Sequence, residues 1–198
     1  KENILLEFVD VEREKIKFWS AGCACGEEAY SFKIIWDLLG NSYPDVPDLE
    51  VLATDINPIY LDRARAGIYQ PSSLKEVTKE IRSRYFKQKG GKKLFEVKGS
   101  LKEGITWKNH HLLSDPPGLD FDIVFLRNNV LTYYKDRLKN RAFSNVLASL
   151  APNGILVLGS HETIPFETSD LIDVDPYPFV FKKRQKNSTV KNPGETRN

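Results

Sequence analysis

Residues 20–31 combine glycine, small and acidic residues in a way that suits a ligand-binding loop. They read Ser-Ala-Gly-Cys-Ala-Cys-Gly-Glu-Glu-Ala-Tyr-Ser and join a predicted strand over 16–21 to a predicted helix over 27–39. Gly22 and Gly26 allow the backbone to approach a ligand closely. Their spacing is Gly-x-x-x-Gly, which differs from the Gly-x-Gly-x-x-Gly loop that binds a pyrophosphate.

Negative charge at the start of that helix bears on the kind of ligand. Glu27 and Glu28 occupy its first turn. A helix N-terminus otherwise binds phosphate through its free N–H groups, so two carboxylates there repel a phosphate and suit a cation. The alternative is that both residues only complement the helix dipole. The sequence leaves these two interpretations open.

Polar residues also follow two other predicted strands. Asp55 comes after a strand over 49–54, where a carboxylate can accept both hydroxyls of a ribose; the alternative is a cap for the next helix. Arg127 and Asn128 follow an apolar run over 121–126, which is typical of a strand buried on both faces. Polar side chains there are costly unless they serve a ligand or a hydrogen-bonded network, and an arginine can hold a carboxylate with two hydrogen bonds.

The sequence does not favour a metal site. Two thiols, Cys23 and Cys25, cannot complete a zinc site, and His110, His111 and His161 have no ligand spacing with them. We expect His110 and His111 to pack or to line the wall of the pocket.

Strands and amphipathic helices alternate along the chain, which predicts an α/β fold. Further helices are expected over 58–66 and 135–150, and further strands over 155–158 and 179–182. This alternation indicates a mostly parallel sheet with helices on both faces. Ligands of such sheets bind beyond the carboxyl ends of the strands, so the three polar segments should lie together.

The pattern changes between about residues 70 and 106. A polar helix is expected over 72–86, and two short strand-like pieces follow at 94–97 and 105–107. We therefore predict a small inserted antiparallel β-subdomain.

Composition narrows the class of protein. The 198 residues are 40% hydrophobic and 28% charged, with a net charge of +2, which suits one soluble domain over 1–183. A nucleic-acid partner is disfavoured, because the dense basic run at 182–186 belongs to a polar tail over 184–198 that we expect to be solvated. No apolar run approaches the ~18 residues that span a bilayer.

The ends and the cysteines suggest where the protein works. The first residues lack a signal-peptide pattern, and the two cysteines lie one residue apart, which favours a reducing cytoplasm over a disulfide framework. The chain has no methionine, even at position 1, so we expect it to be part of a longer protein.

Taken together, these segments resemble the CheR family of methyltransferases, which methylate receptor glutamates in bacterial chemotaxis. Residues 20–31 match the family's Ser-Ala-Gly-Cys-x-x-Gly-Glu-Glu-x-Tyr-Ser at every fixed position. Ala-Thr-Asp-Ile at 53–56, Ala-Arg-Ala-Gly-Ile-Tyr at 64–69, Arg-Asn with a later Tyr-Tyr at 127–134, and Gly-x-x-x-x-Gly-x-x-Glu at 154–162 follow in the family's order. The similarity extends over about residues 18–183.

The resemblance implies a Rossmann-like class I methyltransferase fold that uses S-adenosylmethionine and releases S-adenosylhomocysteine. The cofactor-binding residues that it implies are Ala21, Gly22, Glu27, Asp55, His111, Leu112, Arg127 and Asn128. Within this set Glu27 would face the methionine part, Asp55 the ribose, and His111 with Leu112 the adenine. Arg127 and Tyr133 would be the catalytic residues.

The resemblance also implies partners. The substrate would be a protein, with a chemoreceptor cytoplasmic domain as the leading candidate, and we expect a monomer. The alternative is a catalytically degenerate domain that binds S-adenosylmethionine, its product or a protein as a signal. A nicotinamide dehydrogenase is disfavoured by the glycine spacing and by Glu27 and Glu28.

Three features depart from the family pattern. The family's N-terminal helical domain, which supplies an arginine near the sulfonium, is not in this chain. The Arg-Asn stretch has one residue more before its tyrosine, so Tyr133 and Tyr134 compete for one position, and His111 stands where the family more often has asparagine.

Overall fold

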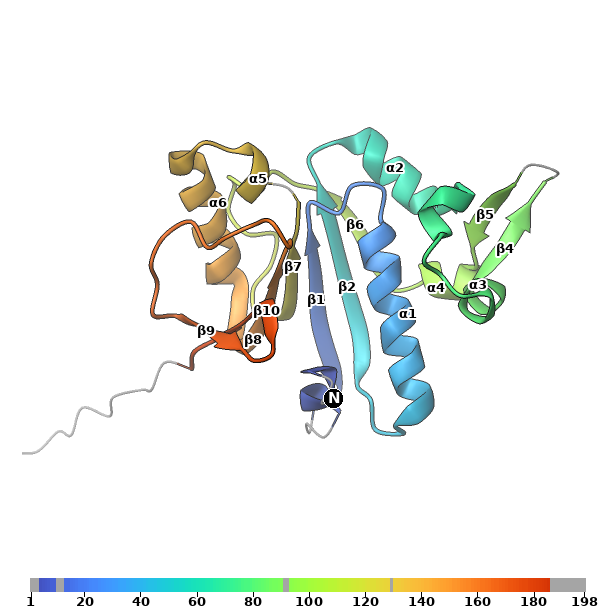
Figure 1. The fold of residues 1–198 in the computed structure, drawn as a ribbon, viewed down its shortest axis with the longest axis horizontal. Helices are drawn as coiled ribbons and strands as arrows, with labels where there is room; N and C mark the ends of the chain where they lie inside the picture. Colours follow the sequence, from blue (N-terminus) through green and yellow to red (C-terminus); the bar gives the residue numbers. More distant parts are fainter. Residues whose placement is uncertain (1–3, 10–12, 91–92, 129, 186–198) are drawn as a thin grey trace, which may run out of the picture.

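The computed structural model describes residues 4–9, 13–90, 93–128 and 130–185, and its main feature is a seven-stranded sheet with helices on both faces (Figure 1). The strand order is β6-β2-β1-β7-β8-β10-β9. The strands are β1 (Lys15–Ala21), β2 (Asp48–Asp55), β6 (Ile105–Asn109), β7 (Phe121–Leu126), β8 (Leu150–Leu158), β9 (Leu171–Val174) and β10 (Tyr177–Lys183). All pairs are parallel except those of β10, which runs antiparallel to β8 and to β9. This confirms the predicted α/β fold.

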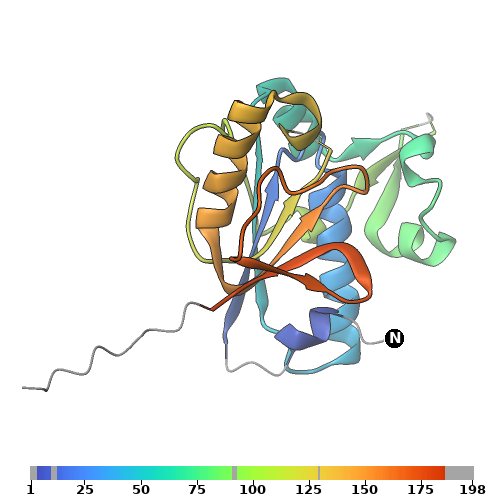
Figure 2. The ribbon, with the colours of Figure 1, turned by 60° about the vertical axis from the view of Figure 1, so that its left-hand side comes forward.

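Alternating side chains of β1, an interior strand of the sheet, pack into two cores. On one face Phe18 stacks on Phe32 of α1 (Glu27–Ser42), with ring centroids 4.1 Å apart. On the other face Trp19 joins Phe143 of α6 (Asp136–Ser149) in a second buried cluster. Figure 2 shows α6 and α1 on opposite sides of the sheet. The two-residue repeat of a strand therefore builds both layers from one sequence run.

The chain order places a ligand crevice at one end of the sheet. From β1 the chain moves outward to β2 and β6, and it then returns to β7 and β8 on the other side of β1. In doubly wound sheets the ligand binds at this reversal, beyond the carboxyl ends of the strands. The loops there lead into α2 (Pro58–Ala66) and α5 (Val130–Tyr133), at the top of Figure 1, whereas the short 3-10 helix η1 (Ile4–Phe8) lies at the other end.

The predicted antiparallel insertion is present as a three-stranded sheet in the order β3-β5-β4. Its strands are β3 (Ile68–Tyr69), β4 (Phe86–Lys89) and β5 (Leu94–Val97). Figure 1 shows it projecting beyond α1. Tyr30 and Ile34 of α1 share a buried cluster with Tyr85 and Val97, so the insertion is attached to the main domain by an apolar core.

The prediction that 105–107 belongs to the insertion is wrong. These residues begin β6, which pairs in parallel with β2 from Val51↔Ile105 to Asp55↔Asn109 and forms an edge of the main sheet. The insertion ends instead with the short helix α4 (Gly99–Lys102). A strand-like pattern identifies the type of an element but not its partner.

The predicted helix over 72–86 is interrupted. It consists of the 3-10 helix η2 (Pro71–Leu74) and the α-helix α3 (Lys79–Tyr85). The hydroxyl of Thr78 accepts the N–H of Ile81 and starts α3 afresh, as expected of an N-cap.

The end of α1 and the presence of β9 (Leu171–Val174) also differ from expectation. Helix α1 continues beyond its predicted end at residue 39, through Gly40 and Asn41 to Ser42. A glycine lowers the stability of a helix but does not by itself end it. Strand β9 was not predicted. Of the predicted tail over 184–198, residues 186–198 lie outside the described part of the chain. Within the described part, none of the helices has the length and apolar character needed to cross a membrane.

Candidate active site

Loops at the carboxyl ends of β1, β2, β6 and β7 enclose a cavity of about 250 Å³. Its lining residues are Gly22, Ala24, Asp55, Ile56, Tyr60, His110, His111, Leu112, Asn128, Tyr133 and Tyr134. Because β1 and β7 flank the reversal in strand order, the cavity lies where a doubly wound sheet binds its ligand.

The carboxylate of Asp55 joins the loop after β1 to the end of β2. One oxygen accepts the N–H of Ala24 at 2.9 Å, and the other accepts the N–H of Asn57 at 2.8 Å. The alternative that Asp55 caps the next helix is wrong, because Asn57 is the N-cap of α2. A carboxylate has about four lone-pair sites, so Asp55 can accept further hydrogen bonds from a ligand.

The two glycines of the first loop have different roles. Gly22 lines the cavity with φ 77°, and its N–H donates to the carbonyl of Thr54 at 2.8 Å. Gly26, with φ 86°, is the N-cap of α1, and a Cβ there would lie 2.8 Å from the ring of Trp107 and 2.9 Å from Cβ of Ala64. Gly26 therefore allows close packing of protein on protein, not the approach to a ligand expected from the sequence.

The acidic pair at the start of α1 is split by the fold. Glu27 is exposed and is not among the lining residues. Glu28 is half-buried, and its carboxylate accepts the hydroxyl of Ser20 and an N–H of Arg127, each at 3.0 Å. Burial raises the pKa of Glu28, while the positive charge of Arg127 acts in the opposite direction. The carboxylate tied into the loop network is thus Glu28, which the cofactor-binding set implied by the family resemblance does not include.

Arg127 and Asn128 face different surroundings. The guanidinium of Arg127 pairs with Glu28 and does not line the cavity. Asn128 lines it in a left-handed conformation, with φ 53°. Its N–H donates to the carboxylate of Glu162 at 2.9 Å. Arg127 is therefore part of a charge network, whereas its neighbour Asn128 borders the cavity.

The loop after β6 forms another wall of the cavity. Nδ1 of His111 accepts the N–H of Leu113 at 3.0 Å, which leaves Nε2 as the protonated nitrogen of the neutral ring. Leu112 is buried, and its carbonyl accepts the side-chain amide of Asn145 on α6 at 3.1 Å. Burial lowers the pKa of His110 below its usual value. This wall is mainly apolar and aromatic.

Tyrosines of α5 and the following turn border the mouth of the cavity. Tyr133 is 78% exposed, and Tyr134 is half-buried with its ring 6.4 Å from that of His111. Both tyrosines line the cavity.

The structure brings together part of the predicted site. The predicted residues that line the cavity are Gly22, Asp55, His111, Leu112, Asn128 and Tyr133. Those outside the lining are Ala21, which is buried at the end of β1, Glu27 and Arg127. Ile56 and Tyr60 also line the cavity and were not predicted, although both closely follow Asp55 in the sequence.

The thiol of Cys23, in the loop after β1, is not activated. Burial raises the pKa of Cys23 to about 12, so its thiol stays protonated at neutral pH. Among the residues that the structure describes, no three His, Cys, Asp or Glu residues gather as metal ligands would.

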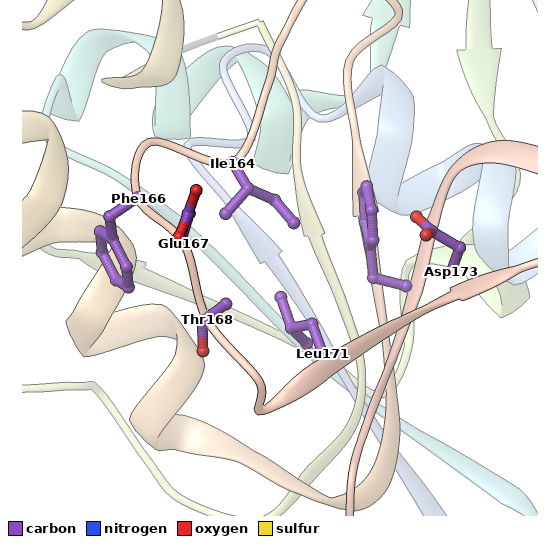
Figure 3. A pocket seen from close by; sticks show the side chains of 7 residues that line it. Ile164, Phe166, Glu167, Thr168, Leu171 and Asp173 are labelled. Atoms are coloured by element: carbon purple, nitrogen blue, oxygen red, sulfur yellow. The ribbon is translucent and has the colours of Figure 1, made fainter.

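A second cavity, of about 370 Å³, lies between the segment after β8 and the strands β9 and β10. Figure 3 shows Ile164, Phe166 and Leu171 around it, with the carboxylates of Glu167 and Asp173 nearby. It shares no lining residue with the first cavity, so it does not belong to the same site.

The strand order and the first cavity, which Asp55 and Asn128 line, define a Rossmann-like domain that binds a ligand at the carboxyl edge of its sheet. Residues 1–177 match the family described as CheR methyltransferase, SAM binding domain. The chain belongs to this family, and its fold is that of a class I methyltransferase. S-adenosylmethionine, named in the family's description, is accordingly the cofactor of the domain.

Curated relatives agree with this assignment. A chemotaxis protein methyltransferase of Listeria monocytogenes is 31% identical over 165 residues, which are 83% of this chain and 60% of the relative. Chemotaxis protein methyltransferase 1 of Vibrio cholerae is 33% identical over 81% of this chain and 58% of its own length. An uncharacterized 104.1 kDa protein of Rhodobacter capsulatus is 29% identical over 149 residues, which are 15% of its length. The chain thus spans about three fifths or less of these relatives.

Among solved structures, a TehB-like SAM-dependent methyltransferase from Corynebacterium glutamicum is similar with a TM-score of 0.49 and 17% identity, over 88% of this chain and 83% of that one. The fold assignment rests on the strand order and not on this similarity.

Proposed function

We propose that this chain transfers a methyl group from S-adenosylmethionine to a carboxylate, namely glutamate side chains of a chemoreceptor-like protein. The observation that carries the proposal is the cavity to which four parallel strands contribute their carboxyl ends. The names of the relatives support the chemotaxis substrate.

The lining residues fit the parts of the cofactor. Asp55 can accept the ribose hydroxyls with the lone pairs that its two backbone partners leave. His111 and Leu112 offer an aromatic and an apolar wall for the adenine. Asn128 borders the methyl-donor side, and Tyr133 lies at the mouth, where an acceptor would enter.

A carboxylate beside the cationic end of the cofactor is part of the proposal. Glu27 is the residue that the family motif implies. Glu28 does not line the cavity either, but its bonds to Ser20 and Arg127 hold its carboxylate at the carboxyl ends of β1 and β7, which favours Glu28. We propose that Glu28 supplies this negative charge, whereas Glu27 stabilises the start of α1 through the helix dipole.

The chemistry requires little more than positioning. S-adenosylmethionine supplies an electrophilic methyl group when it is bound. A glutamate acceptor is ionised at neutral pH, since its ordinary pKa is about 4.3, so the protein needs no general base. Its residues orient the acceptor and exclude water, which can contribute up to ~7–11 kcal/mol in the best cases. Arg127 keeps further N–H donors beside those that bind Glu28 and can hold the acceptor carboxylate.

A second candidate is a cofactor-binding domain without transferase activity. The observation that favours it is the ion pair between Arg127 and Glu28, at 3.0 Å, which engages the guanidinium within the chain.

Labelled methyl transfer to a glutamate-containing receptor cytoplasmic domain separates the two candidates. We expect transfer by the unchanged protein, and a loss of at least tenfold in Arg127→Ala and in Tyr133→Phe. Tyr43→Phe, at the opposite end of α1, is the control and should transfer normally. Full transfer by both site variants would refute their roles, and cofactor binding without transfer by the unchanged protein would favour the second candidate.

Cofactor binding is tested separately by calorimetry with S-adenosylhomocysteine. Asp55→Ala should weaken binding by roughly 10- to 150-fold, because a hydrogen bond to a charged group contributes ~1.5–3 kcal/mol. Unchanged affinity in a folded Asp55→Ala protein would exclude Asp55 from the ribose site.

A further inference from the structure

Glu162 is a buried carboxylate for which the proposed chemistry has no direct use. It follows β8 and is 5% exposed. Burial of a charged group is costly unless hydrogen bonds compensate for the lost water. Glu162 does not line the cofactor cavity, so contact with a ligand there does not explain its position.

The hydrogen bonds of Glu162 join two segments that lie far apart in sequence. Oε2 accepts the N–H of Asn128 and the N–H of Gly159, each at 2.9 Å. Oε1 accepts the hydroxyl of Thr132 at 2.9 Å. One side chain therefore ties the end of β8 to residues on both sides of the start of α5.

Gly159 makes this arrangement tight. A Cβ at this position would lie 2.7 Å from Oδ1 of Asn128 and 2.7 Å from Oε2 of Glu162. These distances are too short for a methyl group, so a side chain at position 159 would displace Asn128 or Glu162.

The residues held by Glu162 include or adjoin two that line the cavity. Asn128 lines it in a left-handed conformation, with φ 53°, which asparagine adopts more readily than most residues other than glycine. Thr132 directly precedes Tyr133, which lines the mouth. The bonds to Glu162 fix the residues on either side of the α5 start.

We propose that Glu162 is a positioning residue, which holds Asn128 and Tyr133 at the cofactor cavity through its bonds to Asn128, Gly159 and Thr132. The inference rests on the proposed cofactor site and deepens it. It also assigns a physical role to the Gly159 and Glu162 positions of the motif at 154–162.

The role depends on hydrogen-bond geometry more than on charge, which makes the glutamine variant informative. In Glu162→Gln the amide oxygen can accept both N–H groups, and the amide NH2 can donate to the hydroxyl of Thr132, since a hydroxyl both donates and accepts. In Glu162→Ala the N–H groups of Asn128 and Gly159 lose this acceptor.

Asp122 provides a matched control. It is also a carboxylate with 5% exposure, and it lies on β7, near the opposite end from Asn128. It accepts the backbone N–H of Lys17 at 2.9 Å and pairs with Arg13. Asp122→Ala therefore removes an equally buried, hydrogen-bonded carboxylate that lies near the other end of β7 from the cavity.

The test is calorimetric binding of S-adenosylhomocysteine at a temperature at which circular dichroism shows each variant to be folded. We expect Glu162→Ala to bind at least tenfold more weakly, Glu162→Gln within about threefold of the unchanged protein, and Asp122→Ala within about threefold despite a lower Tm. If Glu162→Ala does not fold, Thr132→Val and Gly159→Ala replace it, and both should weaken binding.

Unchanged affinity in folded Glu162→Ala, or in both replacement variants, would overturn the proposal. An equal loss in Asp122→Ala would also overturn it, because general destabilisation would then account for the effect. A failure of Glu162→Gln to restore binding would refute the geometric role. Absence of binding by the unchanged protein would instead reject the cofactor site itself, and with it this inference.

Discussion

Glu27 and Glu28 are adjacent and chemically identical, yet helical phase separates them. Glu28 lies on the same stripe of α1 as Phe32 and Leu39, which are buried. Glu27 lies on the stripe of Ser31 and Ile35, which are exposed. Because residues four apart share a helix face, the periodicity of the sequence already distinguishes the inward glutamate from the outward one.

His110 predicts a pH dependence of stability. Burial, with smaller contributions from Lys108 and His111, lowers its pKa in the folded protein below the unfolded value of about 6.5. The folded state therefore favours the neutral ring. The stability from this preference is fully present above about pH 6.5 and is lost as the pH falls through the lowered folded pKa.

Thermal unfolding between pH 7 and pH 5 checks this prediction. We expect Tm to fall less steeply in His110→Gln than in the unchanged protein. His161→Gln is the control, because His161 is exposed. Parallel Tm curves for His110→Gln and the unchanged protein would contradict the prediction.

At the scale of elements, the junctions between β1, α1 and β6 depend on close packing at Gly26. Gly26 is the N-cap of α1 and meets two requirements there. Its φ is positive, and the ring of Trp107 leaves no room for a Cβ, so only glycine fits. The sequence indicated a turn at this place. It could not identify the neighbour, because the strand-like piece at 105–107 was grouped with the insertion, whereas Trp107 belongs to β6 of the main sheet.

Gly26→Ala should lower the free energy of unfolding by about 2–5 kcal/mol. A left-handed conformation costs a residue with a Cβ ~1–2 kcal/mol, and overpacking adds ~1–3 kcal/mol. Equilibrium unfolding in urea measures the change. The matched control is Gly40→Ala in the interior of α1, where a Cβ would meet nothing within 4 Å. It should stabilise the protein by roughly 0.5–1 kcal/mol, and equal effects of the two changes would refute this account.

The whole molecule is organised by one sheet that carries an apolar core on each face. Phe18 and Trp19 are both 0% exposed although they point in opposite directions. The period-two pattern of the strands predicted two covered faces. Which helix covers which face depends on the handedness and order of the connections, which local pattern does not reveal.

Phe143→Ala should lower the free energy of unfolding by about 3–5 kcal/mol, because it removes a large side chain from a packed core. Phe143 is 0% exposed, whereas Leu138, on the same helix, is 44% exposed, so Leu138→Ala should change stability much less. Calorimetry should show one transition in each protein, since both cores share the sheet. Separate transitions for the two faces would contradict this.

Local sequence by itself determined the types of most elements, the glycine-containing turn between β1 and α1, and the polar positions that follow β1, β2 and β7. Periodicity and backbone preferences act over a few residues, so they can be read along the chain. The tertiary structure alone decided that β6 joins the main sheet, that Arg127 pairs with Glu28, and that Glu162 holds Asn128. Arg127 and Glu28 are 99 positions apart, and such contacts depend on how packed elements bring distant side chains together.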